Sequence, residues 1–173
     1  MSIRTISSDG SIIVTPFSRD TVSLRVANET LGSYTTADVN YINNASQEPI
    51  EDLTIPVTNG GVYVIEFRSQ LSIGNAAHNI KFGMDDGGAT ATFAKTEWTF
   101  ADGAGTTLTV LCTSLAATAS GGATTAWTSV FMRGLVSFSA GGTLLIMPAQ
   151  ASAGLSTSSV LAYASLKATR IGG

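Results

Sequence analysis

Charge is scarce in this chain of 173 residues, and cysteine, histidine and long apolar runs are nearly missing. Only 12% of the residues are charged, about half the share of a typical soluble domain. The single cysteine, Cys112, excludes an intrachain disulfide, and its apolar setting, LTVLC, indicates a small buried side chain. No apolar stretch approaches the ~20 residues of a membrane helix. We therefore expect no membrane partner.

The few charges are unevenly distributed. Residues 1–60 hold seven acids and three bases, whereas residues 61–173 hold five acids and six bases, for a net charge of −3. No cluster of lysine and arginine is present to neutralise phosphates, so we expect no nucleic-acid partner. The opening residues, MSIRTISSDG, lack the apolar core of a secretory signal. We expect synthesis in the cytoplasm.

Alternating apolar residues predict strands along most of the chain. In GVYVIEFRSQLSI, for example, Tyr63, Ile65 and Phe67 share one face. Glycine-containing breaks such as Asn59-Gly60-Gly61 and Gly141-Gly142 separate such segments, as turns do. Only residues 36–44 suit a helical turn. This pattern predicts an all-β fold, an antiparallel β-sandwich or jelly roll.

The first third of the chain differs in composition. SIIVTPF and TVSLRV are candidate strands, but residues 28–48 are polar and irregular. We therefore predict an extended N-terminal arm over residues 1–55 and a jelly-roll domain over residues 56–173. Within the arm, the apolar Ile12, Ile13, Val14 and Phe17 are the predicted anchoring residues.

Groups for catalysis are few. His78 is the one histidine, in the polar setting GNAAHN with no orienting carboxylate beside it in sequence, so a loop histidine is favoured over a catalytic base. Asp85-Asp86-Gly87-Gly88 describes a turn as well as a calcium site and lacks the EF-hand spacing. Glu66 and Arg68 share a strand face, which favours an ion pair over a catalytic acid. We predict no catalytic residues, no metal site, no cofactor and no enzymatic activity.

Two segments are apolar on both sides of their strands. In WTSVFMRGLVSFS, Trp127, Phe131 and Leu135 lie opposite a second apolar set. In SSVLAYASLKATRI, read as one strand, Leu161 and Tyr163 lie opposite another. Such strands need a packed layer on each side, and exposed apolar patches mark interfaces. We predict a homo-oligomer, a trimer, with Trp127, Phe131, Leu161 and Tyr163 at its interface.

Three elements resemble the jelly-roll domains of tailed-bacteriophage virion proteins. They are an opening strand with glycine, tyrosine and glutamate, a hairpin with G-T-L, and a closing strand that ends in T-R-I. The matching residues are Gly61, Tyr63, Ile65 and Glu66; Gly134, Val136, Phe138, Gly142, Thr143 and Leu144; and Leu166, Ala168, Thr169, Arg170 and Ile171. The resemblance covers residues 55–171. The chain is also loosely similar to the trimeric heads of tumour-necrosis-factor and complement type.

This resemblance implies a non-enzymatic structural protein located in the virion. Its partners would be further copies of itself and the major capsid protein or another virion protein. The absence of a long fibre shaft from the chain favours a trimeric capsid decoration or head-fibre protein over the alternative, a tail-fibre tip that binds a receptor such as a host-surface glycan. A bacterial lectin-like or polysaccharide-active protein is a further alternative of a different class.

Overall fold

The computed structural model describes residues 3–6, 12–15, 29–122 and 124–173, the first two ranges as backbone. Strands account for most of these residues. The elements are β1 (Ile3–Ile6), β2 (Ile12–Thr15), β3 (Thr30–Tyr34), β4 (Val39–Tyr41), β5 (Thr54–Val57), β6 (Val62–Ile73), the 3-10 helix η1 (Ala76–His78), β7 (Ile80–Asp85), β8 (Thr90–Ala101), β9 (Thr107–Cys112), β10 (Ala119–Ser120), β11 (Ser129–Ala140), β12 (Gly142–Gln150), β13 (Ser158–Val160) and β14 (Ser165–Gly172).

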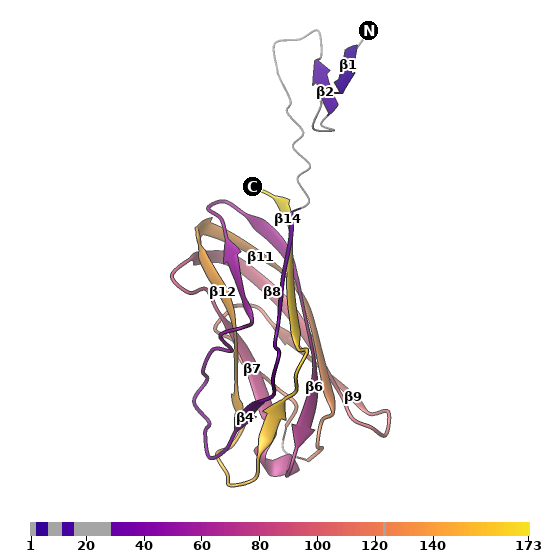
Figure 1. Ribbon diagram of the computed structural model, residues 1–173, viewed down its shortest axis with the longest axis vertical. Coiled ribbons are helices and arrows are strands. Elements are labelled where there is room, and N and C mark those ends of the chain that lie inside the picture. The colour runs from indigo at the N-terminus through magenta and orange to yellow at the C-terminus, as the bar shows by residue number, and fades with distance from the viewer. Residues whose placement is uncertain (1–2, 7–11, 16–28, 123) are drawn as a thin grey trace.

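Two antiparallel sheets face each other (Figure 1). The large sheet has the order β3-β14-β6-β11-β8-β9, and β13 and β4 extend it beside the end of β6. The small sheet has the order β10-β7-β12-β5. From β5 onward the chain passes back and forth between the sheets, as in a jelly roll. The predicted all-β sandwich is confirmed.

The core lies between the sheets because side chains alternate along each strand. On β6, Tyr63, Ile65 and Phe67 are buried, whereas the residues between them are partly or fully exposed. Aromatic rings fill the centre: those of Phe82 and Trp98 stack with their centroids 5.6 Å apart. The apolar alternation seen in the sequence therefore forms the inner layer of the large sheet.

The indole N–H groups of the two buried tryptophans have hydrogen-bond partners. The indole Nε1–H of Trp98 donates to Oγ1 of Thr96 over 3.0 Å. The indole of Trp127 donates to the Gly121 carbonyl over 2.8 Å. A Cβ at position 121 would collide with that indole, so glycine is required there for this contact. Both tryptophans are thereby held as core residues.

The boundary predicted at residue 55 differs from the structure. β3 pairs with β14, β4 with β13, and β5 with β12. Ile50 and Leu53, between β4 and β5, are buried in the core. The residues from 30 onward therefore belong to the sandwich: their polar sequence reflects edge strands and connections, which bury only part of their side chains. An arm over the residues before 29 stays a prediction, and TVSLRV lies outside the described residues.

The helical turn predicted at residues 36–44 is wrong. That segment contains β4 between bends, and the Asp38 carboxylate accepts a hydrogen bond from the Ala162 backbone N–H over 2.7 Å. Pairing with β13 satisfies the backbone there, so a helix is not needed. A short 3-10 helix, η1, occurs instead before β7, where Asn75 caps its first turn.

The last predicted strand is interrupted. Val160 of β13 lies opposite Leu71, and Ser165 of β14 lies opposite Arg68. Four residues, 161–164, thus stand against only two of β6, and Tyr163 has a φ of 65°. Thr35 holds this bend: its carbonyl accepts from the Tyr163 N–H over 2.9 Å and its hydroxyl from the Ala164 N–H over 3.0 Å. The bend adds two residues to the strand.

Candidate interaction surface

Within residues 29–122 and 124–173, the large sheet has one side that the small sheet does not cover, here called the outer face. The side chains at its centre belong to β14, β6, β11 and β8 and alternate with the buried ones, and β3 and β9 lie at its two edges. They are Ser165 and Lys167; Val64, Glu66, Arg68 and Gln70; Ser129, Phe131, Arg133 and Leu135; and Lys95, Glu97 and Thr99. This mixture of charged, hydroxyl and apolar side chains contrasts with the apolar core behind it.

A row of alternating charge crosses the outer face. The strand register places Lys167 opposite Glu66, Glu66 opposite Arg133, and Arg133 opposite Glu97. Nε of Arg133 lies 3.9 Å from Oε1 of Glu66, and the arginine side chain is 67% exposed. Cross-strand pairs of opposite charge stabilise a sheet, but an exposed pair contributes only about 0–1 kcal/mol.

Glu66 is therefore part of an exposed cross-strand ion pair, which the sequence favoured over a catalytic acid for Glu66 and Arg68. The two residues do share the outer face, but Glu66 pairs with Arg133, and the Arg68 guanidinium carbon instead lies 4.9 Å from the centre of the Phe131 ring. This is a cation–π contact. In the described part of the chain Arg68 has no carboxylate within ion-pair distance. Its guanidinium is thus held in place by a ring while its donors face solvent.

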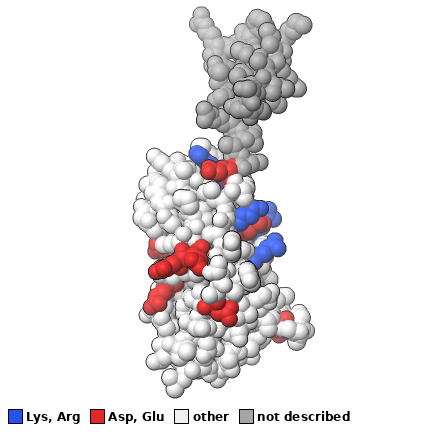
Figure 2. All heavy atoms as spheres, in the orientation of Figure 1, with Lys and Arg blue, Asp and Glu red and all other residues white. Residues whose placement is uncertain are grey.

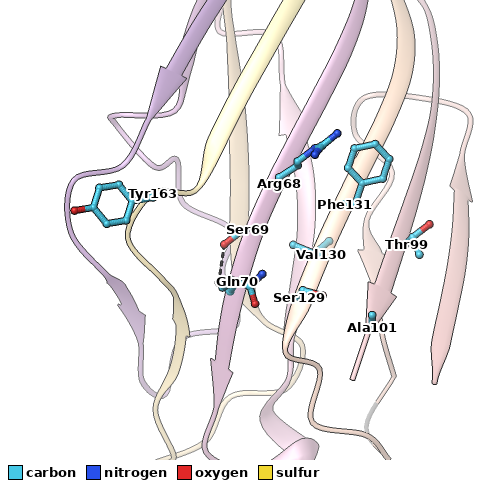
Figure 3. Close-up of a pocket in the computed structure, with 9 residues that line it drawn as sticks. All are labelled: Arg68, Ser69, Gln70, Thr99, Ala101, Ser129, Val130, Phe131 and Tyr163. Carbon is cyan, nitrogen blue, oxygen red and sulfur yellow. Dashed lines mark hydrogen bonds between the residues drawn. The ribbon is translucent and has the colours of Figure 1, made fainter. Parts of the chain in front are cut away.

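Two open depressions of about 510 Å³ each lie on the outer face. The first is lined by Arg68, Gln70, Thr99, Ser129 and Phe131 with their neighbours, and Figure 3 shows these side chains around it. Tyr163 lies at its rim, and its ring points away from the others in Figure 3. The second is lined by Val64, Glu97, Phe131, Arg133, Gly134 and Leu135. The first offers amide, hydroxyl and charged groups beside apolar surface, and the second offers charged groups beside apolar surface.

The segment that contains β4 and leads to β5, residues 38–52, carries the opposite charge. It contains Asp38, Glu48, Glu51 and Asp52 and no base. It runs beside β12 of the small sheet, where the N–H groups of Glu48 and Ile50 donate to the carbonyls of Pro148 and Ile146 over 3.3 and 3.1 Å. In Figure 2 basic side chains lie on the right and at the top of the described part, and acidic groups without a basic neighbour lie on the left, near the centre and at the lower right.

The four predicted interface residues occupy different environments. Trp127 is 3% exposed and belongs to the core, because the chain turns inward before β11 begins at Ser129. Leu161 is partly buried, and its N–H donates to the Gln70 carbonyl over 3.0 Å. Phe131 lies on the outer face, and Tyr163 is 79% exposed. The structure brings only Phe131 and Tyr163 to one depression. A role for these residues in assembly stays a prediction.

The predicted anchoring residues fall in the first part of the chain. Ile12, Ile13 and Val14 belong to β2, which pairs with β1 in an antiparallel hairpin. Phe17 lies outside the described residues. Anchoring by this segment stays a prediction.

The other residues that the sequence offered for chemistry are His78, Asp85 and Cys112, and their contacts are those of loops, turns and the core. His78 Nδ1 lies 3.2 Å from the Ser152 carbonyl oxygen. The Asp85 carboxylate accepts from the Gly87 N–H over 2.7 Å, as in a turn. Cys112 is buried as predicted, and burial raises the pKa of its thiol. Across the described ranges no three potential ligands from His, Cys, Asp and Glu come together for a metal ion.

The phenol of Tyr41 is also buried, and this burial raises its pKa, with a smaller contribution from the neighbouring charge of Glu48. No helix in the described parts of the chain has the length and apolar character needed to cross a membrane.

Comparison with known proteins gives no family. No protein-family model matches the chain, and no curated protein matches its sequence. Among solved structures, chains of the Gx and Gt strains of infectious bursal disease virus match 99% and 98% of this chain at 10% identity, with TM-scores of 0.22 and 0.21. This chain spans about half the length of either one (49% and 50%). Likenesses this distant carry no functional argument, and the resemblance to phage virion proteins stays a prediction.

Proposed function

We propose that this chain is a non-enzymatic structural protein of a virion, a homotrimeric capsid decoration or head-fibre protein. The observation that carries the proposal is the jelly roll with its outer face, where Val64, Phe131 and Leu135 are interspersed with charges. Jelly rolls recur in viral capsid proteins and in lectins. A face that mixes apolar and charged groups suits contact with another protein. The sequence motifs of Tyr63, Val136 and Arg170 support the virion setting.

In this proposal residues 1–28 attach the trimer to the major capsid protein or to another virion protein. The apolar residues Ile12, Ile13, Val14 and Phe17 make the contact. The scarcity of charge and the absence of disulfides then fit a protein made in the host cytoplasm and stabilised by packing and assembly.

One observation favours a second candidate, a receptor-binding tip of a tail fibre. The first depression presents the Arg68 guanidinium, the Gln70 amide and the hydroxyls of Thr99 and Ser129 beside the Phe131 ring. Planar polar side chains beside an aromatic ring suit the hydroxyls and apolar face of a sugar. A host-surface glycan is the ligand of this candidate.

Removal of the protein from the virus that encodes it separates the two. For a decoration protein, particles that lack the chain should adsorb to cells normally but lose infectivity faster on heating. Particles of unchanged heat resistance that no longer adsorb would establish the tail-tip candidate instead. Absence of the chain from purified wild-type particles, judged by mass spectrometry, would overturn both.

Simultaneous replacement of Ile12, Ile13, Val14 and Phe17 by serine tests the arm in the full chain. We expect an unchanged mass by sedimentation equilibrium and loss of the protein from particles. Normal incorporation of this variant into particles would show that the anchor lies elsewhere.

A further inference from the structure

The basic residues of the described ranges are concentrated on one surface. Residues 29–173 contain six of them, namely Arg68, Lys81, Lys95, Arg133, Lys167 and Arg170, and four of these lie on the outer face. That face carries only two acids, Glu66 and Glu97, so its net charge is +2 although the whole chain has −3. Residues 38–52, which begin beside β13 and then run along β12 of the small sheet, have a net charge of −4. One molecule thus presents two surfaces of opposite sign.

We propose that the outer face of one copy binds the acidic segment, residues 38–52, of the next copy. The contact joins two different surfaces, so it is heterologous and closes into a ring when the rotation between copies permits. This inference rests on the proposed function only in taking a second copy as the partner. It specifies which two surfaces of the chain meet and which charges favour their contact.

Charge selects this pairing over the symmetric one. Two outer faces placed against each other would bring net charges of +2 together, and like charges at an interface are unfavourable. The acidic segment removes that repulsion. Glu51 and Asp52 are exposed at its end and accept no hydrogen bond in the described part of the chain. Their carboxylates are therefore available to Lys95, Lys167 and Arg68, whose cations are also exposed.

Apolar groups match as well. Ile42 is 54% exposed within the acidic segment. The second depression of the outer face offers Val64, Phe131 and Leu135, with Arg133 and Glu97 at its sides. An apolar centre surrounded by charged groups is the usual anatomy of a protein interface.

The outer face is also large enough. β6, β8 and β11 have 12 residues each, which at ~3.4 Å per residue is about 40 Å. Four strands at ~4.8 Å spacing are about 19 Å wide, so the face covers about 750 Å². A stable interface buries about 800 Å² per partner. The outer face is therefore of about the size that a stable interface needs.

Charge reversal with rescue tests the pairing in the full chain. One variant carries E51K and D52K, a second carries K95E and K167E, and a third carries all four substitutions. A fourth variant, K81E, reverses a base outside the outer face and serves as the control. All these side chains except the partly buried Lys81 are exposed, and circular dichroism with thermal melting verifies that each variant folds.

Sedimentation equilibrium at 50 mM salt gives the readout. We expect the first two variants to associate at least tenfold more weakly than the wild type. The variant with all four substitutions should associate with an affinity within about threefold of the wild type. K81E should associate like the wild type. Wild-type association should also weaken at 1 M salt, where the Debye length is ~3 Å.

Three results would overturn the inference. If the wild type is an oligomer and both two-site variants associate as strongly, the interface lies elsewhere and the proposed function is intact. The same holds if the variant with all four substitutions folds but does not regain wild-type association. A wild-type chain that is monomeric at 100 μM would remove the proposed homo-oligomer together with this contact.

Discussion

The inner and outer faces of the large sheet use the same strands for different purposes. On β11, Met132 and Val136 are fully buried against the small sheet. Their neighbours on the outer face, Phe131 and Arg133, are partly or largely exposed. Because side chains alternate with a period of two, stability and recognition can change independently on one strand. The predictions below test how sharply this division holds.

The largest contrast is expected between two adjacent residues of β11. Met132→Ala leaves a cavity in the core and should lower the free energy of unfolding by about 2–5 kcal/mol. Phe131→Ala removes a ring that remains partly solvated, so its cost should be less than half as large. Urea unfolding followed by circular dichroism measures both. Equal losses would mean that the outer face is as tightly packed as the core.

The second-largest contrast is expected between threonine hydroxyls on the two faces, whose removal should cost different amounts of stability. Thr96 is 2% exposed, and its Oγ1 accepts the hydrogen bond of the Trp98 indole. Thr96→Val leaves that N–H buried without a partner, which should cost about 1–3 kcal/mol. Thr99→Val on the outer face loses only a long contact of 3.4 Å to Thr109 and should be nearly neutral. The same urea titrations apply, and a costly Thr99→Val would contradict the division.

A smaller effect is expected from the cation–π contact. Arg68→Gln should lower the free energy of unfolding by about 0.5–1 kcal/mol, because the guanidinium over Phe131 is lost at an exposed site. Lys95→Gln, on the same face and without a ring beneath it, serves as the control and should change stability little. If both variants lose the same amount, the ring contributes nothing measurable.

The smallest effect concerns Asp102, in the turn between β8 and β9 and beyond both faces. Hydrogen bonds from the Thr106 and Ala104 N–H groups lower the pKa of its carboxyl below the usual 3.8. A lowered pKa in the folded state means that the charged form is stabilised. Its contribution is therefore present above pH 3.8 and disappears as the pH falls through the lowered pKa.

Asp102→Asn should thus lower the melting temperature slightly at pH 6 and by less at pH 2. Differential scanning calorimetry at both values measures the two differences. If the loss of melting temperature caused by Asp102→Asn is larger at pH 2 than at pH 6, the charged carboxylate is not the source of the stabilisation.

The alternation of apolar residues along a strand was sufficient to predict which side chains form the inner face. It was insufficient to predict the contacts on the outer face. Tyr63, Ile65 and Phe67 were predicted to share a face because only their own strand decides it. The partner of Glu66 depends on the register between β6 and β11, which are far apart in sequence. Arg133 could therefore not be identified as its partner from local sequence, although both residues were correctly expected on strands.

The other differences between the sequence-based expectations and the structure arise at the ends of strands and at the edges of sheets. Alternation counted back from Phe131 put Trp127 on the outer face, but β11 starts only at Ser129 and the indole turns to Gly121. The polar composition of residues 30–57 hid three edge strands, because an edge buries few of its side chains. The acidic character of this region was evident from the sequence; its position opposite a basic face needed the fold.

The bend at residues 161–164 has a consequence for how this strand tolerates length changes. It adds two residues, and an even number leaves Val160 and Leu166 pointing to the same side of the sheet. That is why the segment reads as one uninterrupted strand. A chain that loses both extra residues would keep every later side chain of β14 on its present side, whereas loss of one would turn Lys167 inward and Leu166 out. The C-terminal strand can thus change in length only in steps of two.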